Sequence, residues 1–273
     1  MRPGAKSLAM ERRPSPEAAT VASAVKLDGV SHSFLTSKVV DDVTIDIAAG
    51  EFCSIVGPSG CGKTTCLNIV AGEIPVQQGS VQVLGESPRL GRRDIAYMFA
   101  RDALLPWRTA ADNVAIGLEA RRVPRGERHE RARDLLASVG LGDYVDAYPS
   151  KLSHGMRQRV AIARTFAVSP DLLLMDEPFA ALDAQTRLLL EDTLIRLWET
   201  QRSTVLFVTH DLAEAIALSD RIVLMSARPG RVKRVFDVPI ERPRSVRKLQ
   251  GSPEFHEIFE AIWTDLEEEV ETL

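Results

Sequence analysis

A glycine-rich turn between a strand-like segment and a helix-like segment constrains the fold of this chain more than any other feature. Residues 57–65 read GPSGCGKTT; the pattern of residues 51–56 predicts a buried strand, and a helix is expected from about Lys63 to Val70. In this context, glycines let successive backbone N–H groups converge on phosphate oxygens, and the helix N-terminus adds the positive end of its dipole. A chance glycine-rich turn is the alternative, but the match to GxxxxGK[ST] at every fixed position argues against it.

The turn therefore predicts a site for the phosphates of a nucleotide. Lys63 would place a point charge on the β- and γ-phosphates, and the Thr64 hydroxyl would ligate Mg²⁺. The residues expected to contact the nucleotide here are Gly57, Pro58, Ser59, Gly60, Cys61, Gly62, Lys63, Thr64 and Thr65.

An acidic pair ends a second apolar segment. Residues 172–175 read LLLM and are followed by Asp176 and Glu177. A buried strand can hold Asp176 stiffly at the carboxyl end of a sheet, where it would orient Mg²⁺ directly or through water. Glu177 would then polarise the attacking water. An ordinary strand that ends in a solvated acidic turn is the alternative, and the phosphate-binding turn upstream disfavours it.

Residues 151–183 narrow the class of nucleotide-binding protein. They combine the sequence LSHGM at 152–156, a basic helix and the apolar strand with its acidic pair. This run resembles the signature motif and the acidic pair of ATP-binding-cassette (ABC) ATPases. The resemblance implies ATP and Mg²⁺ as cofactors. It also implies a head-to-tail dimer with a second copy of the chain, in which Ser153 and Gly155 of one copy contact the γ-phosphate of ATP held by the other. Read alone, the segment is an amphipathic helix capped by Ser153.

The same resemblance assigns roles to three further residues. His210 matches the switch histidine that contacts the γ-phosphate, so the expected catalytic residues are Glu177, His210 and Lys63. Asp183 matches the loop that couples the two active sites. Phe34 is the candidate for stacking on adenine, and a plain core phenylalanine is the alternative.

Two positions depart from the ABC pattern. Ala100 follows the short segment 95–99 where the family has a glutamine that meets Mg²⁺ and the transporter interface. Losing that contact would cost on the order of 1–3 kcal/mol. His154 replaces a glycine of the signature, which would cost on the order of 1 kcal/mol if the loop needs an unusual φ. We hypothesise that Ala100 alters coupling or rate without abolishing turnover.

Three less specific segments of the sequence resemble those of one group of importers. The segments 101–109 (RDALLPWRT), 155–164 and 175–186 are similar to those of the ATP-binding subunits of bacterial nitrate, sulfonate and taurine importers. The resemblance implies two copies of this chain beneath two integral membrane permease subunits, at the cytoplasmic face of the bacterial membrane. A periplasmic or lipid-anchored solute-binding protein would deliver the anion. The LLPW element would receive a helix of the permease; a simple turn before a helix capped by Thr109 is the alternative.

Two other functions are compatible with parts of the sequence. An ATP-sensing regulatory subunit with little hydrolysis is suggested by Ala100 and His154. A soluble cassette ATPase that acts on DNA or ribosomes would carry a coiled-coil insertion or a second cassette, and this sequence has neither. The net charge of −4 gives no electrostatic reason to expect nucleic acid as a partner.

The order of predicted elements defines the expected fold class and domains. Strands that alternate with helices after residue 156 indicate a parallel sheet covered on both faces, the α/β core of a P-loop NTPase. We expect an N-terminal antiparallel β subdomain and an α-helical subdomain at about 101–160. The expected divisions are a disordered leader at 1–24, the ATP-binding domain at 25–235 and a C-terminal extension at 236–273. No stretch is apolar enough to span a bilayer.

Overall fold

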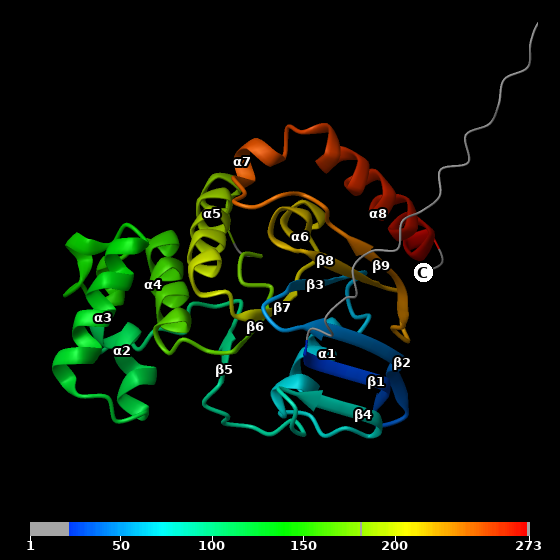
Figure 1. Cartoon of the computed structure of the whole chain (residues 1–273), viewed down its shortest axis with the longest axis horizontal. Helices are drawn as coiled ribbons and strands as arrows, with labels where there is room; N and C mark the ends of the chain where they lie inside the picture. The colour runs from blue at the N-terminus through cyan, green and yellow to red at the C-terminus, as the bar shows by residue number, and fades with distance from the viewer. Residues whose placement is uncertain (1–21, 181, 272–273) are drawn as a thin grey trace, which may run out of the picture.

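The computed structural model describes residues 22–180 and 182–271, and its strands form two sheets. The leader predicted at residues 1–24 lies outside the described residues except for 22–24, and residues 23–24 already belong to the first strand. Figure 1 shows the two sheets side by side, with a group of three helices on one flank and the C-terminal helices arching over the other.

The smaller sheet is antiparallel and lies near the N-terminus. Its strands are β1 (Ser23–Phe34), β2 (Ser37–Ala48) and β4 (Gln78–Val83), in the order β2-β1-β4. Along β2, Val43, Ile45 and Ile47 are buried while the residues between them are exposed, which confirms the predicted alternation. The antiparallel subdomain of the expected fold is therefore present.

The larger sheet has the order β5-β6-β7-β3-β8-β9. Its strands are β3 (Phe52–Val56), β5 (Ile95–Met98), β6 (Leu172–Asp176), β7 (Thr204–Val208), β8 (Arg221–Met225) and β9 (Val232–Asp237). The first five are parallel, as predicted, but β9 pairs antiparallel with β8. The sequence did not predict β9, because only Phe236 of this basic edge strand is buried and no clear alternation marks it.

Helices cover both faces of the larger sheet. Leu172 and Leu174 of β6 pack toward α1 (Lys63–Ala71) and the smaller sheet, whereas Leu173 and Met175 pack toward α5 (Ala184–Gln201). This division follows from the alternation of side chains along a strand. Both faces of β6 are apolar, so the acidic pair at its end is held by a rigid strand.

Three helices form the separate group on the left of Figure 1. They are α2 (Ala110–Ala120), α3 (Arg125–Ser138) and α4 (His154–Ala167), and Val114, Leu136 and Val160 meet in their shared core. Between α3 and α4 lie two short 3₁₀ helices, η1 (Gly142–Tyr144) and η2 (Pro149–Lys151). The Thr109 side chain caps α2, as the sequence predicted.

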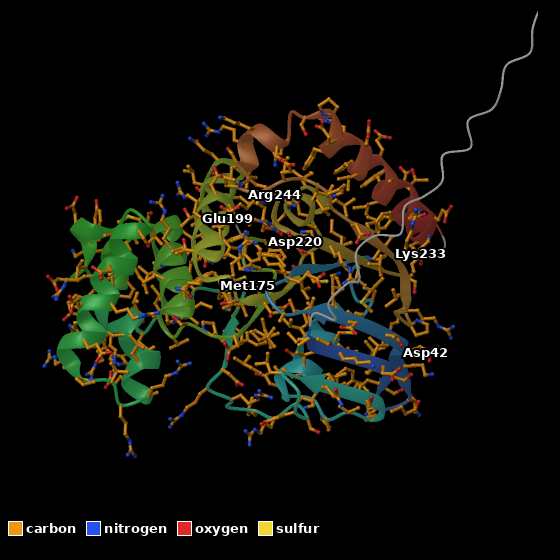
Figure 2. All side chains as sticks on the ribbon, in the orientation of Figure 1. Asp42, Met175, Glu199, Asp220, Lys233 and Arg244 are labelled. Atoms are coloured by element: carbon orange, nitrogen blue, oxygen red, sulfur yellow. The ribbon has the colours of Figure 1, made fainter. Side chains whose placement is uncertain are left out.

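The C-terminal part returns to the larger sheet. It contains α7 (Val246–Leu249) and α8 (Pro253–Glu271), which packs against α6 (Leu212–Leu218). The buried Arg244 guanidinium donates to the carbonyl oxygens of Ser219 and Ile240, both at 2.7 Å, and so ties the extension to the end of α6. Figure 2 shows Arg244 close to Asp220 and Glu199 beneath α7. Among the described residues, no helix is long and apolar enough to cross a membrane.

Candidate nucleotide-binding and hydrolysis site

The glycine-rich turn connects β3 to α1 and lines a cleft of about 380 Å³. Gly62 caps α1 with φ at 102°, and a Cβ there would overlap Val40. A Cβ on Gly57 would lie 2.6 Å from the carbonyl oxygen of Met225. Glycine is required at both positions, by the left-handed backbone at one and by the close approach at the other. The residues lining the cleft are Val39, Ser59, Gly60, Gly62, Lys63, Thr64, Thr65, Glu177 and Arg228.

Lys63 is buried at the base of this cleft. Its Nζ donates to the carbonyl oxygens of Gly57 and Pro58, at 2.8 and 3.0 Å. Both acceptors belong to the turn itself, so the ammonium group is held inside the loop that is predicted to surround the phosphates. A phosphate oxygen can take over these hydrogen bonds without a large movement of the side chain.

Thr64 and Asp176 bring two oxygen donors together from distant parts of the sequence. The Thr64 hydroxyl donates to Asp176 Oδ1 at 3.0 Å, because α1 begins and β6 ends at the carboxyl edge of the parallel sheet. Burial raises the pKa of Asp176 above its ordinary value, and the Thr64 hydrogen bond offsets part of this rise. A hydroxyl and a carboxylate are the hard oxygen ligands that Mg²⁺ prefers, and Mg²⁺ usually keeps several waters besides. The pair fits Mg²⁺.

Glu177 and His210 form a second pair beside the first. His210 Nδ1 lies 3.1 Å from Glu177 Oε2, and both side chains are partly exposed. Glu177 lines the cleft, whereas His210 is not among the residues that line it. Glu177 has φ at 44°, and its backbone N–H donates to the carbonyl oxygen of Val208 at 2.9 Å. A non-glycine residue in the left-handed region persists only where the surroundings hold it, and such residues gather at functional sites.

The other predicted site residues do not line the cleft. Phe34 is 48% exposed and lies edge-on to His32. Ser153 and Asp183 cap their own helices: Ser153 Oγ accepts from Met156 N at 3.3 Å, and Asp183 Oδ1 accepts from Thr186 N at 2.9 Å. These residues face solvent within one chain.

The signature segment and the Asp183 segment nevertheless lie against each other. A Cβ on Gly155 would come within 2.8 Å of the Thr186 methyl group, so glycine permits the first turns of α4 and α5 to approach closely. Ser153 and Asp183 therefore belong to one continuous surface, separate from the phosphate-binding turn.

The structure shows the local contacts of Ala100 and His154, the two residues that depart from the ABC pattern. The carbonyl oxygen of Ala100 accepts from the buried Gln158 Nε2 at 3.2 Å, a backbone bond that any residue at position 100 can make. His154 is the first residue of α4, and its ring Nδ1 lies 3.2 Å from Arg157 Nη2. Its backbone is helical, so the backbone strain considered for a residue replacing glycine does not arise.

Asn113 was not identified from the sequence, although it organises the segment before α2. Its Oδ1 accepts from Leu105 N at 2.7 Å, and its Nδ2 donates to the carbonyl oxygens of Leu105 and Arg108, both at 3.1 Å. Asn113 is fully buried, whereas Trp107 is 71% exposed. A polar residue on the buried face of an amphipathic helix was the available signal.

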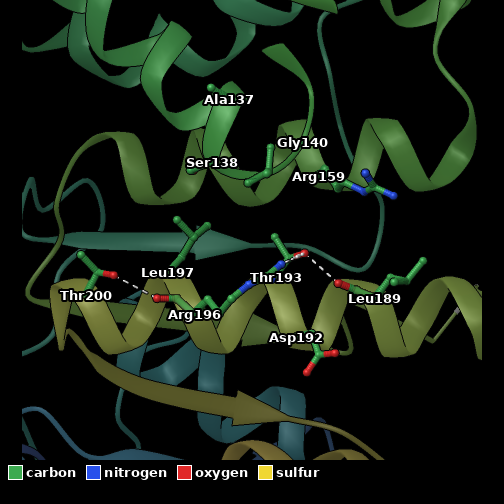
Figure 3. A pocket seen from close by; sticks show the side chains of 11 residues that line it. Ala137, Ser138, Gly140, Arg159, Leu189, Asp192, Thr193, Arg196, Leu197 and Thr200 are labelled. Carbon is green, nitrogen blue, oxygen red and sulfur yellow. Dashed lines mark hydrogen bonds between the residues drawn. The ribbon is translucent and has the colours of Figure 1, made fainter. Parts of the chain in front are cut away.

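A second pocket, of about 550 Å³, is larger than the cleft at the glycine-rich turn and lies between the end of α3 and α5. Arg159, Thr193 and Leu197 contribute to its lining (Figure 3). None of the predicted nucleotide-contacting residues lies in it, so volume alone does not mark the functional site.

The phosphate-binding turn at the carboxyl edge of a parallel sheet places the chain among the P-loop NTPases. The family model described as ABC transporter matches residues 40–180, and the chain belongs to this family. It is an ATP-binding subunit that hydrolyses ATP.

Named relatives extend the similarity over most of the chain. The taurine import ATP-binding protein TauB of Rhizobium johnstonii is 42% identical over 231 residues, which cover 83% of this chain and 88% of the relative. The bicarbonate transport ATP-binding protein CmpD of Synechocystis is 40% identical over 239 residues, 85% of each chain.

A solved structure supports the same class. The ATP-binding cassette MJ0796, in a dimeric post-hydrolysis state bound to ADP and phosphate, is 33% identical with a TM-score of 0.68. The match covers 80% of this chain and all of that one.

Proposed function

We propose that this chain supplies ATP hydrolysis to a membrane importer of a small organic or inorganic anion. Two relatives that it matches over more than four fifths of its length are named for the import of taurine and the transport of bicarbonate. The taurine name belongs to the nitrate, sulfonate and taurine class predicted from the sequence, and bicarbonate is another small anion. The relatives give no support to the alternative, an ATP-sensing regulatory subunit.

The observation that carries the importer assignment is the segment before α2. Asn113 fixes the backbone of Leu105 and Arg108 from inside, while Trp107 between them is exposed. A large aromatic side chain on a rigid loop is typical of a protein-binding surface. We infer that a helix of the permease packs on it.

The assembly then contains two copies of this chain beneath two permease subunits, on the cytoplasmic face of the membrane. A separate solute-binding protein delivers the anion from the other side. ATP closes the two copies, and hydrolysis with phosphate release reopens them, which drives alternating access in the permease.

The chemistry follows from the paired side chains in the cleft. Lys63 binds the β- and γ-phosphates, while Thr64 and Asp176 would hold Mg²⁺, which would supply positive charge beside the phosphates. Glu177 accepts a hydrogen bond from the attacking water and takes its proton, and His210 orients the Glu177 carboxylate.

The second half of the site comes from the partner copy. Ser153 and Gly155 of one copy reach the γ-phosphate held by the other, and Asp183 lies at the contact between the two. MJ0796 is dimeric, and both its structures cover 80% of this chain. Ser153 and Asp183 are exposed, Gly155 is partly exposed, and none of the three lines the cleft, which supports this arrangement.

The test of this proposal distinguishes the coupling of the chain to the permease from ATP hydrolysis by the chain itself. The chain is reconstituted in vesicles with the permease encoded by a neighbouring gene, and anion uptake is measured beside ATP turnover without permease. We expect Trp107→Ala to lower uptake about tenfold, since a buried aromatic contact is worth about 1–2 kcal/mol or more. Turnover of the isolated chain stays unchanged.

Trp263→Ala is the matched control, because Trp263 is also an exposed tryptophan, 45% accessible, but lies on α8. Equal loss of uptake in both variants, or no loss with Trp107→Ala, contradicts the assignment of the loop to the permease.

A further inference from the structure

The segment 227–231, between β8 and β9, is fixed against the nucleotide cleft. Gly230 N donates to the carbonyl oxygen of Val39 at 2.8 Å, and Asp41 N donates to the carbonyl oxygen of Gly230 at 2.9 Å. A Cβ on Gly230 would overlap the carbonyl of Cys61 in the phosphate-binding turn. The segment is thus held on one side by β2 and on the other by the turn itself.

Arg228 of this segment lines the same cleft as Lys63 and Thr64. Its Nη2 donates to Ser37 Oγ at 2.7 Å, and its Nε donates to the carbonyl oxygen of Lys38 at 3.4 Å. These two bonds fix the plane of the guanidinium at the mouth of the cleft. Neither acceptor belongs to the phosphate-binding turn.

The position of Ser37 shows which end of the cleft this is. Ser37 pairs directly with Phe34 across the β1–β2 hairpin. Arg228 and Phe34 therefore flank the same hairpin turn, whereas Glu177 comes from the end of β6 on the side of Asp176. The guanidinium lies at the end of the cleft away from the predicted γ-phosphate position.

The C-terminal helix holds this segment from behind. Glu269 of α8 accepts from Ala227 N at 2.8 Å, next to Arg228 in the chain, and pairs with Lys233 Nζ at 3.0 Å. The Glu269 side chain is only 18% exposed. Helix α8 is thus linked to the segment that carries Arg228 by one partly buried carboxylate.

We propose that Arg228 contacts the base and ribose end of ATP, and that Glu269 on α8 positions it. A planar guanidinium packs flat against an aromatic ring system, and a purine offers such a ring. The proposal rests on the assignment of ATP to the cleft lined by the Gly57–Thr65 turn, and it adds a residue that lies 163 positions beyond Thr65 in the sequence.

The experiment compares ATP with inorganic tripolyphosphate, which has the phosphates but no base or ribose. Affinity for each is measured by competition against a fluorescent ATP analogue. Arg228→Ala should weaken ATP about fivefold and leave tripolyphosphate unchanged. Arg228→Lys should recover little of the loss, since a point charge lacks the flat guanidinium face. Lys63→Ala should weaken both ligands.

Glu269→Ala tests the positioning role, with Asp265→Ala as its matched control. Asp265 lies on the same helix but pairs with Arg234 of β9, at 3.1 Å, rather than with segment 227–231. Glu269→Ala should weaken ATP about twofold to threefold, again without effect on tripolyphosphate, and Asp265→Ala should weaken neither.

The outcomes separate this proposal from the site assignment. Unchanged affinities with Lys63→Ala would mean that the cleft is not the ATP site. If Lys63→Ala acts and Arg228→Ala does not, the site stands and the role of Arg228 is refuted. Equal losses of ATP and tripolyphosphate with Arg228→Ala would place the residue on the phosphates and refute the contact with the base.

Discussion

The phosphate-binding turn and the signature segment differ in how complete they are within one chain. Around the turn, Lys63 and Thr64 at the start of α1 lie close to Asp176 and Glu177 at the end of β6. Lys63 already hydrogen-bonds to the turn, Thr64 to Asp176, and Glu177 to His210. Around the signature, Ser153 only caps its own helix and faces solvent. The first region is a binding site as folded, whereas the second is a surface that needs a ligand from outside. This difference is what a site shared between two copies requires.

Glu177→Gln should have the largest effect on ATP turnover, because it removes the proposed general base of the first region while keeping the size and shape of the side chain. Removing the base should lower ATP turnover by about 10³-fold, within the range for general base catalysis. ATP affinity should remain, because Lys63 and the turn are untouched. Turnover is measured by phosphate release and ATP affinity by titration. If wild-type turnover is no higher than that of the variant, the chain is an ATP sensor.

Ser153→Ala tests the second region. Loss of one hydrogen bond to the γ-phosphate should lower turnover about 10²-fold, while ATP affinity of the single chain stays unchanged. The variant also removes a helix cap, worth about 1 kcal/mol. Thr109→Ala is the matched control, because Thr109 caps α2 in the same way, accepting from Asp112 N at 3.1 Å. Equal turnover in the two variants would mean that Ser153 only caps its helix and does not contact the γ-phosphate.

Local sequence patterns predicted the first region well. The glycines at 57, 60 and 62 mark a turn because few other residues tolerate φ above zero, and all three adopt such angles. The apolar run at 172–175 predicted a buried strand, and β6 is buried on both faces. Both features are contained within a dozen residues, where spacing alone carries the information.

Contacts between distant segments were not predictable in this way. The Thr64–Asp176 pair depends on the order of strands, in which β7 lies between β3 and β6. Arg228 reaches Ser37 across 191 positions. No periodicity in the sequence predicts such a contact, since the contact forms only when the two sheets have assembled. The same holds for β9, an edge strand with a single buried residue.

Ala100→Gln should change ATP turnover less, and it tests a position that lies between the two regions. Position 100 follows β5 and is exposed, and its carbonyl oxygen accepts from Gln158 of α4, so a glutamine side chain can be added without breaking this hydrogen bond. A restored contact to Mg²⁺ or the attacking water should raise turnover about tenfold, from an interaction of about 1–3 kcal/mol. Turnover and anion uptake are both measured. No change in either would refute the hypothesis that Ala100 sets rate or coupling.

The smallest effect is expected between the two regions, where the acids Glu191 of α5 and Glu214 of α6 are buried. Burial raises the pKa of Glu214 to about 8 and that of Glu191 to about 7, and both titrate near the Arg187–Asp211 ion pair that joins α5 to the His210 segment. The folded chain therefore favours the protonated carboxyl of Glu214 more than the unfolded chain does.

This stabilisation is complete below the ordinary pKa of a glutamate and is lost as pH rises through about 8. Glu214→Gln imitates the neutral form, so the variant should lose less stability than the wild type between pH 6 and pH 9, by about 5 °C in Tm. Thermal unfolding over this pH range measures the difference, with Glu257→Gln on the exposed face of α8 as control. Parallel Tm curves for wild type and Glu214→Gln would show that the acid is already ionised in the fold.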